Sequence, residues 1–515
     1  MARLEGESMR TLAAAVTAAL LAATLPATAQ AQDRVGAPAS PHFAQTITWG
    51  PCTDIDAPAL ECGTYTAPQD WRAPRNGKDI TIAVSRLKPR SGQARGSVLT
   101  NPGGPGGPGR LLPTAYLGRS KLVDNFEIIG VDPRGTGAST NVTCANFDFL
   151  TVADPRDRSR ANVGLLYDAA EFQASACQRR SGEFGRVVNT EQTVKDFDLL
   201  RHLLGREKVS WIGYSGGTWL GAYYATYFPN RVDKFVLDSN AEFTTTFQDV
   251  FDEFGRGFER RFRVDFLPWV AKHDSVYHLG TTAEQVRQRY EQARAALAKN
   301  PIALPDGTLF DGVLLDLVLM QGQYSKQLFP TVAQTFSQVA QTTSGAVAAA
   351  ALDVRYPDAP TATLYSITCN DTQFRGGRER LAREAERLGR QYPLMGYYQL
   401  LAPCAFWDRP PLHLKTPTGK GVPPVLMVQS VRDPATPVEG ARRAHEQFAG
   451  SRLLTVTDEG DHGIYGFGNA CVDDLVESFI VDGVVPARDV TCPGTPLPDP
   501  TTAPPARPSL VQGWF

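Results

Sequence analysis

Short hydrophobic runs alternate with longer helical patterns in the first half of the chain. The runs are rich in β-branched residues and bounded by Gly and Pro, which is typical of strands; they are residues 80–84, 97–100, 127–131, 208–212 and 235–237. Residues 193–204 instead place Val194, Phe197 and Leu200 at helical spacing. This alternation predicts an α/β fold, a mostly parallel sheet flanked by helices.

The pattern becomes mainly helical after Asn240, as in residues 282–298, and hydrophobic strands return only at 425–428 and 452–456. Two independent domains are the alternative, but they would leave the last two strands without a sheet to join. We therefore expect one discontinuous core with a large, mainly helical cap inserted late in it. The expected boundaries are 32–240 for the first part of the core, 241–417 for the cap and 418–492 for the second part.

The two ends of the chain have compositions of their own. Residues 12–25 are apolar and uncharged, follow Arg10, and lead to small residues at 27–31, which predicts a signal peptide over 1–31. This run is short for a membrane span, and a buried core helix is the alternative reading. Residues 493–515 are rich in Pro and Thr and are expected to form an irregular tail. We expect a secreted, extracellular protein without a membrane anchor.

Cysteine usage agrees with export. The chain has eight cysteines and no C-x-x-C pair, which favours disulfide bonds over a metal site. Many pairings are possible, and proximity in sequence alone favours Cys52–Cys62, Cys144–Cys177, Cys369–Cys404 and Cys471–Cys492.

Composition excludes several other classes of function. With 52 basic and 54 acidic residues, the formal net charge is −2, which gives no electrostatic reason to expect nucleic acid as a partner. The sequence has no H-E-x-x-H motif, no Cys/His cluster with ligand spacing and no dinucleotide fingerprint. We expect no metal, no organic cofactor and no cofactor protein.

The strongest chemical signal is the motif Gly-Tyr-Ser-Gly-Gly at residues 213–217. It directly follows the expected strand 208–212 and precedes an apolar helical stretch at 219–227. In that context G-x-S-x-G predicts a nucleophile elbow, a tight turn that exposes a serine above the sheet. Ser215 is the expected nucleophile, and the α/β-hydrolase fold is the expected architecture.

A serine hydroxyl needs a base and a group that orients the base. In this fold the acid and the histidine follow the nucleophile in that order, each after a late strand. Asp433 follows the strand at 425–428, and His462 follows the strand at 452–456. Asp458 and Asp461 also lie near His462 in sequence and are competing candidates for the acid.

A Gly-rich segment, Asn-Pro-Gly-Gly-Pro-Gly-Gly-Pro-Gly at residues 101–109, directly follows the expected strand 97–100. We expect it to bring the N–H of Gly104 to the substrate carbonyl oxygen, with the N–H of Gly216 as the second donor of an oxyanion hole. A phosphate-binding loop is the less favoured reading, because the segment has no G-K-[ST] and prolines replace several donors. A purely structural turn is the other alternative.

These residues resemble a known family. Residues 101–106 resemble the HGGPG oxyanion segment of proline iminopeptidases, and residues 132–139 resemble their D-x-R-G-x-G-x-S turn. The C-terminal segment is similar to that of secreted tripeptidyl aminopeptidases of actinobacteria, in residues 424–437, 461–463, 469–473 and 491–493. The resemblance covers nearly the whole chain after the signal peptide, although the cap matches only in patches.

The resemblance implies an exopeptidase that removes short units from peptides with a free N-terminus. Relatives place acidic cap residues at the substrate's α-ammonium, and Asp371 is the candidate here, with Asp252 and Glu253 as competitors. The family often has Gly before the histidine where this chain has Asp461, which leaves the triad intact. Aromatic cap residues are candidates for lining the substrate pocket: Trp269, Tyr324, Tyr365, Tyr397, Tyr398 and Trp407.

Three functions are compatible with these observations. The favoured one is a secreted serine aminopeptidase that releases tripeptides, dipeptides or single prolines. An esterase or lipase-like hydrolase would use the same Ser215, Asp433 and His462, so the triad does not separate the two. A non-catalytic binding module is the third, and the presence of all three residues in the expected order argues against it.

Overall fold

The computed structural model describes residues 40–146, 153–304, 307, 309–341, 357–400, 402–408 and 412–502. The expected signal peptide and the tail beyond residue 502 lie outside the described residues. None of the helices in the described ranges is long and apolar enough to cross a bilayer.

One ten-stranded sheet forms the core, with strand order β1-β2-β3-β5-β4-β6-β7-β10-β11-β12. The strands are β1 Gly50–Pro51, β2 Glu61–Pro68, β3 Asp79–Leu87, β4 Ser97–Asn101, β5 Glu127–Asp132, β6 Val209–Tyr214, β7 Val232–Asp238, β10 Val425–Ser430, β11 Arg452–Thr457 and β12 Val490–Pro493. All pairs from β5 to β12 are parallel, and the pairs among β1, β2, β3 and β5 are antiparallel. The predicted mostly parallel α/β sheet is confirmed.

Alternate residues of the central strands point to opposite faces of this sheet. Leu99 and Trp211 join a hydrophobic cluster with helices α3 (Thr190–Leu203) and α4 (Gly216–Tyr227). Their neighbours, such as Val98 and Ile212, join a second cluster with α1 (Ser120–Asn125) and α15 (Ala470–Ile480). Helices thus cover both faces, and burial of the strands on both sides explains their nearly continuous hydrophobic sequences.

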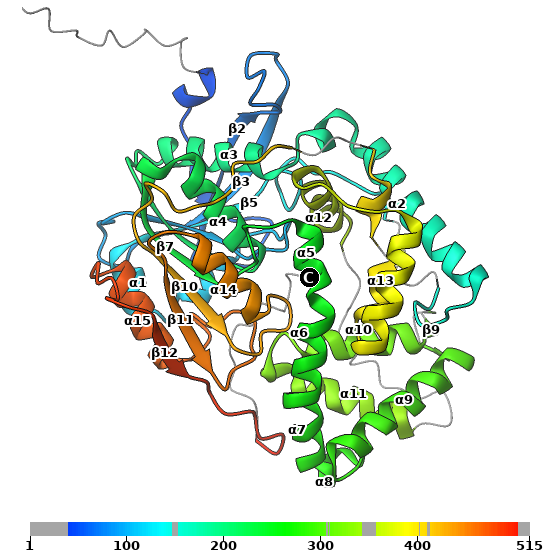
Figure 1. Ribbon diagram of the computed structural model, residues 1–515. Helices are drawn as coiled ribbons and strands as arrows, with labels where there is room; N and C mark the ends of the chain where they lie inside the picture. The colour runs from blue at the N-terminus through cyan, green and yellow to red at the C-terminus, as the bar shows by residue number, and fades with distance from the viewer. Residues whose placement is uncertain are drawn as a thin grey trace, which may run out of the picture. The chain divides into compact units, whose positions relative to one another are not determined.

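A mainly helical cap lies between β7 and β10 (Figure 1). Its helices are α5 Phe247–Asp252, α6 Phe254–Arg261, the π-helix η4 Phe262–Phe266, α7 Leu267–Lys272, α8 Asp274–Tyr277, α9 Ala283–Lys299, α10 Gly312–Gly322, α11 Phe329–Gln341, α12 Asp358–Asp371 and α13 Arg378–Gln391. A short hairpin, β8 Ile302–Ala303 and β9 Leu309–Phe310, interrupts them. The cap has a hydrophobic cluster of its own, to which Phe262, Leu315 and Phe336 belong.

Figure 1 shows α5, α6 and α7 following one another in a line, with the sheet on one side and α9, α10 and α13 on the other. The first two helices are separated only by Glu253, which keeps α-helical backbone angles. This line of helices therefore borders the core along the length of the cap.

Four disulfide bonds connect Cys52–Cys62, Cys144–Cys177, Cys369–Cys404 and Cys471–Cys492. These are the pairings that proximity in sequence predicts, and no free cysteine remains. Bonds of this kind persist in oxidising compartments, so the four bonds indicate an extracytoplasmic protein.

Candidate active site

Ser215 stands at a sharp turn between β6 and α4. Its backbone angles, φ 54° and ψ −122°, are rare for a residue with a side chain and cost on the order of 1–3 kcal/mol. The turn closes because its flanking positions carry no side chain: a Cβ on Gly213 would lie 2.4 Å from the carbonyl oxygen of Gly217, and one on Gly217 would lie 2.6 Å from the carbonyl oxygen of Asn101. The local geometry is that of a nucleophile elbow.

His462 and Asp433 form a buried acid–base pair. Nδ1 of His462 lies 2.9 Å from Oδ1 and 3.0 Å from Oδ2 of Asp433, whose side chain is fully buried. Oδ1 also accepts hydrogen bonds from the N–H groups of Ala435 (3.0 Å) and Thr436 (2.8 Å). The other ring nitrogen, Nε2, is buried and has no hydrogen-bond partner within the described ranges, so it is available to exchange a proton.

The two competing acids contact other groups. Asp461 accepts hydrogen bonds from Arg261 Nη2 at 2.5 Å and from the N–H of Lys326 at 2.7 Å. Asp458 has a side chain that is 93% exposed and lies 3.7 Å from Arg432. The carboxylate that touches the histidine is that of Asp433.

The Gly-rich loop after β4 packs directly against the elbow. A Cβ on Gly103 would stand 2.7 Å from the amide nitrogen of Gly216 and 2.9 Å from Cβ of Ser215. A Cβ on Gly216 would stand 3.2 Å from the amide nitrogen of Gly104. The two expected oxyanion donors, Gly104 and Gly216, are therefore neighbours beside the serine. The N–H of Gly103 is already used, because it donates to Oδ1 of Asn101 at 3.0 Å.

Asp238, at the end of β7, is a structural support that sequence reasoning missed. It is fully buried, and its Oδ2 accepts hydrogen bonds from the N–H groups of Ile464 (3.0 Å) and Tyr465 (2.8 Å), just after His462. Its backbone carbonyl accepts a hydrogen bond from the N–H of Ser215 at 3.0 Å. Burial raises the pKa of Asp238 to about 6. An acid that ends a buried strand was the available signal for this position.

The cap also contacts the histidine directly. The carbonyl oxygen of Tyr324 accepts a hydrogen bond from the N–H of His462 at 2.9 Å, and the two rings meet edge to face with centroids 5.4 Å apart. Phe258 in α6 packs edge to face on Tyr324, also at 5.4 Å. Of the aromatic cap candidates, Tyr324 therefore lies beside His462, and it also belongs, with Trp269 and Tyr398, to the cap's hydrophobic cluster.

Asp371 ends α12 and is only 1% exposed. Its Oδ1 accepts a hydrogen bond from the N–H of Thr190, the first residue of α3, at 2.9 Å. Its Oδ2 accepts no hydrogen bond of ordinary geometry from the described residues, although the indole of Trp219 lies beside the carboxyl and lowers its pKa. Burial raises the pKa of this carboxyl to about 7.

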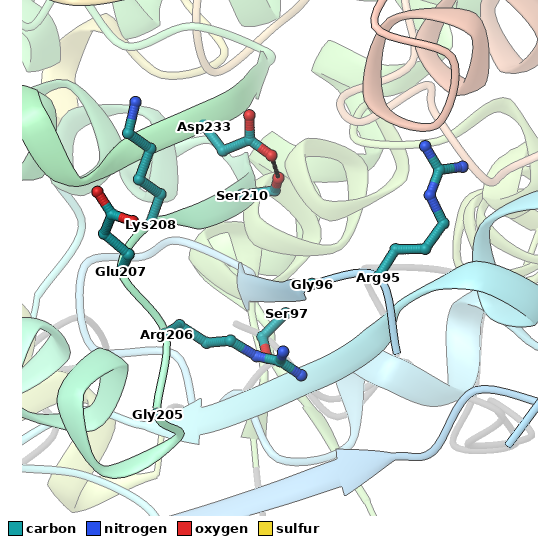
Figure 2. Close-up of a pocket in the computed structure, with 9 residues that line it drawn as sticks. All are labelled: Arg95, Gly96, Ser97, Gly205, Arg206, Glu207, Lys208, Ser210 and Asp233. Atoms are coloured by element: carbon teal, nitrogen blue, oxygen red, sulfur yellow. Dashed lines mark hydrogen bonds between the residues drawn. The ribbon is translucent and has the colours of Figure 1, made fainter. Parts of the chain in front are cut away.

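A cavity of about 360 Å³ opens elsewhere, at the edge of the sheet where β4, β6 and β7 begin (Figure 2). It is lined by Arg95, Gly96, Ser97, Gly205, Arg206, Glu207, Lys208, Ser210 and Asp233. Ser210 in this cavity donates a hydrogen bond to Asp233 at 3.3 Å, and no histidine lines it. Ser215, Asp433 and His462 follow the opposite ends of their strands, so this cavity is separate from the candidate active site.

Within the part of the chain that the structure covers, no group of three or more His, Cys, Asp or Glu residues is arranged to hold a metal ion.

Comparison with known proteins gives the same picture. Residues 96–303 match the family described as alpha/beta hydrolase fold, and residues 392–492 match the family described as TAP-like protein. A tripeptidyl aminopeptidase of Streptomyces lividans is 36% identical over 480 residues, which cover 88% of each chain. Serine protease Hip1 of Mycobacterium tuberculosis is 28% identical over 492 residues, covering 88% of this chain and 92% of that one. Carboxylesterase B of the same organism is 27% identical over 499 residues, covering 91% and 94%.

The sheet, the inserted cap and the serine elbow beside a buried His–Asp pair define a serine hydrolase of the α/β-hydrolase class. Within that class the chain belongs to the TAP-like family: residues 392–492 match its model, and the similarity to the Streptomyces tripeptidyl aminopeptidase extends over 88% of the chain.

Proposed function

We propose that this protein is a secreted serine exopeptidase that releases tripeptides from the free N-termini of peptides. The carrying observation is the buried His462–Asp433 pair, whose Nε2 has no other partner among the described residues, in a chain that also carries Ser215 at an elbow. The tripeptide unit is proposed from the Streptomyces relative. The expected signal peptide and the four disulfide bonds support secretion.

In this mechanism Oγ of Ser215 attacks the scissile carbonyl carbon while Nε2 of His462 takes the hydroxyl proton. Asp433 keeps the imidazole in one tautomer and stabilises the imidazolium that forms. The N–H groups of Gly104 and Gly216 donate to the oxyanion, each contributing roughly 3–4 kcal/mol to the transition state. His462 then protonates the leaving amine. In the second half of the reaction His462 takes a proton from water, the water attacks the acyl-enzyme, and His462 returns the proton to Oγ of Ser215.

An aminopeptidase also needs an acid for the substrate's ammonium group, and we assign that role to Asp371. Among the cap candidates, Glu253 has an arginine partner, with Oε2 3.0 Å from Nη1 of Arg256, and burial raises the pKa of Asp252 to about 6. Asp371 is the most deeply buried of the three and has no arginine partner among the described residues, and burial is the main cause of its raised pKa. An arriving ammonium would ionise this carboxyl and pair with it.

The test uses the fluorogenic peptide Ala-Ala-Pro-reporter with a free or an acetylated N-terminus, and compares wild type with Ser215→Ala. We expect cleavage of the free peptide only, no activity in the variant, and Ala-Ala-Pro as the released unit by mass spectrometry. Asp371→Asn should raise KM for the free peptide and leave hydrolysis of a p-nitrophenyl ester unchanged.

An esterase is the second candidate, favoured by the similarity to carboxylesterase B. If both peptides resist cleavage while wild type, but not Ser215→Ala, turns over the p-nitrophenyl ester, the triad assignment stands and the peptidase proposal fails.

A further inference from the structure

Two ion pairs of opposite polarity join the cap to the residues that directly precede the catalytic acid and base. Arg261, the last residue of α6, donates to Asp461, which precedes His462. Asp265, one helical turn later in the π-helix η4, has Oδ1 2.9 Å from Nε of Arg432, which precedes Asp433; this contact is an ion pair without hydrogen-bond geometry. We call Arg261, Asp265, Asp461 and Arg432 the charge clamp. The two cap members, Arg261 and Asp265, lie four residues apart and carry opposite charges. The two core residues that they pair with, Asp461 and Arg432, also carry opposite charges.

Most of the charge clamp is buried from solvent. The side chain of Arg261 is fully buried, that of Asp265 is 6% exposed, and that of Asp461 is 17% exposed. Nε and Nη1 of Arg261 have no hydrogen-bond partner in the described part of the chain, so its Nη2 contact with Asp461 carries the pairing. A buried ion pair is sensitive to geometry, because its attraction must offset the desolvation of both charges.

Two glycines make room for this approach. A Cβ on Gly460 would lie 2.2 Å from Nη1 of Arg261 and 2.7 Å from Oδ2 of Asp265. A Cβ on Gly257 in α6 would lie 2.0 Å from the carbonyl oxygen of Pro434, in the loop that carries the catalytic acid. The backbone of α6 therefore contacts the loop of the catalytic acid at Gly257, and the charged side chains of the clamp pack on the backbone of the histidine loop at Gly460.

The two catalytic loops are also tied to each other at the same place. The N–H of Arg432 donates to the carbonyl oxygen of Glu459 at 2.9 Å, and Oγ of Ser430 donates to that of Asp461 at 2.8 Å. Lys326 of the cap reinforces the contact, because its ammonium lies 2.6 Å from Oε2 of Glu459. A shift of α6 and η4 would thus move both loops, and with them Asp433 and His462.

We propose that the charge clamp is a positioning device through which the docked cap sets the alignment of Asp433 and His462. Its four members are positioning residues: they touch neither substrate nor Ser215 in the proposed reaction and act through the two residues that follow them. The inference rests on the serine-hydrolase part of the proposed function and does not depend on which peptide or ester is hydrolysed.

The experiment measures kcat and KM per titrated active site, with a fluorophosphonate that reports the concentration of reactive Ser215. Arg261→Met, Asp461→Asn and the double variant are compared with wild type, first on a p-nitrophenyl ester and then on the peptide. Arg260→Met is the matched control, because the neighbouring Arg260 also joins α6 to the core, through Glu439 at 2.7 and 3.2 Å, but contacts no residue next to the triad. Melting temperatures identify variants that fold poorly. Arg432→Gln tests the second ion pair of the clamp, at a residue that is less buried than Arg261.

We expect each clamp variant to lose about tenfold or more in kcat with little change in KM, because small misplacements of catalytic groups are costly. The double variant should lose no more than the worse single variant, Arg261→Lys should recover part of the rate, and Arg260→Met should resemble wild type. Unchanged kcat per active site in both Arg261→Met and Arg432→Gln would overturn the proposal. So would a change confined to KM, or an equal loss in Arg260→Met. If the wild-type enzyme hydrolyses neither the ester nor the peptide, the proposed function itself fails instead.

Discussion

Hydrogen bonds from backbone amides to buried carboxylates hold the side chains that we propose to react. Asp433 accepts two such bonds in addition to its contact with His462, and Asp238 accepts two from the residues just beyond the histidine. Turning either carboxylate would leave buried N–H groups without partners, which costs about 1–3 kcal/mol for each group. Asp433 therefore holds the ring of His462, and Asp238 holds the backbone of the residues that follow it.

The first prediction concerns the charge of Asp433. Asp433→Asn keeps the size of the side chain but cannot stabilise the imidazolium and favours the wrong tautomer of His462. We expect kcat to fall by roughly 10,000-fold while the melting temperature stays near that of wild type. Steady-state kinetics on the ester or peptide substrate measure this. Asp458→Asn is the control, because its exposed side chain does not touch the histidine; equal activity of the two variants would contradict the assignment.

A second prediction follows from the burial of Asp371, which raises its pKa to about 7 in the folded protein from 3.8 in a solvated chain. Between these values the folded state holds a proton that the unfolded state has released. The stability from this group is therefore fully present below about pH 4 and is lost as the pH rises through about 7. In Asp371→Asn the free energy of unfolding should fall less over this range, with a difference on the order of 2–4 kcal/mol near pH 8.

Urea unfolding of both proteins at several pH values between 4 and 8 tests this prediction. Parallel curves of unfolding free energy against pH would show that Asp371 does not titrate in that window. The substrate effect proposed for the same residue is separate, because it is measured as KM for peptides with a free amine.

The strand–turn–helix unit of β6, Ser215 and α4 is the element on which the site depends. It needs glycine at 217, because a Cβ there would also lie 2.9 Å from Oδ1 of Asn101 and would push the Gly-rich loop away. The Gly-rich loop and the elbow are thus one structural unit, although more than 100 residues separate them in sequence.

We accordingly predict that Gly217→Ala lowers kcat/KM by roughly 100-fold, since displaced oxyanion donors no longer meet the developing charge. Gly118→Ala provides a matched control, because a Cβ at Gly118 meets nothing within 4 Å. Kinetics of both variants after titration of active Ser215 separate a loss of rate from a loss of folded protein. A wild-type rate in Gly217→Ala would show that the loop tolerates the displacement.

The sequence predicted those elements whose signal lies within a few consecutive residues. The strands β3 to β7, β10 and β11 appear as hydrophobic runs because both of their faces are buried, and the elbow depends on a five-residue motif. Strands at the two ends of the sheet were missed: the edge strand β1 has two residues, its neighbour β2 is half-exposed, and the edge strand β12 is four residues long and ends in a proline. Such strands depend on their neighbours for stability, so their own sequences carry little signal.

The same reasoning explains what was found and missed at the site. Asp433 and His462 could be placed because the fold fixes the strands they follow. Tyr324 was named among the aromatic candidates, but its bond to His462, 138 residues away by the numbering, has no local signature. Arg261 looks like one more charged residue at the end of a helix, and only the packing of α6 on the catalytic loops shows that it is buried.

At the scale of the whole molecule, hydrophobic contacts and ion pairs both join the core to the cap. Two hydrophobic clusters cover the faces of the sheet, and a third fills most of the cap. The first sheet cluster also takes in cap residues of α5 (Phe247) and α12 (Ile367), and Phe254 packs against both this cluster and the cap cluster. The charge clamp and the ion pair of Lys326 with Glu459 add polar connections, and the Cys369–Cys404 bond fastens the end of α12 within the cap.

The last prediction concerns that bond. Cys369 and Cys404 close a loop with a sequence separation of 35, whereas Cys52 and Cys62 close one of only 10. A disulfide bond stabilises mainly by restricting the unfolded chain, and the effect grows with loop length. We expect Cys369→Ala/Cys404→Ala to lower the free energy of unfolding by about 2–4 kcal/mol, and Cys52→Ala/Cys62→Ala to lower it by less. The urea midpoint should fall, and the slope should rise rather than fall, because the unfolded chain without the bond is less compact and exposes more surface.

The position of this bond adds an effect on activity that loop length does not predict. Cys369 lies two residues before Asp371 on α12, so its loss should loosen the carboxylate assigned to the substrate's amine. KM for a peptide with a free N-terminus should then rise in Cys369→Ala/Cys404→Ala but not in Cys52→Ala/Cys62→Ala, with ester hydrolysis unchanged in both. If the two double variants lose stability equally and neither changes KM, the bond in the cap only stabilises the chain, and α12 is held in place by its packing alone.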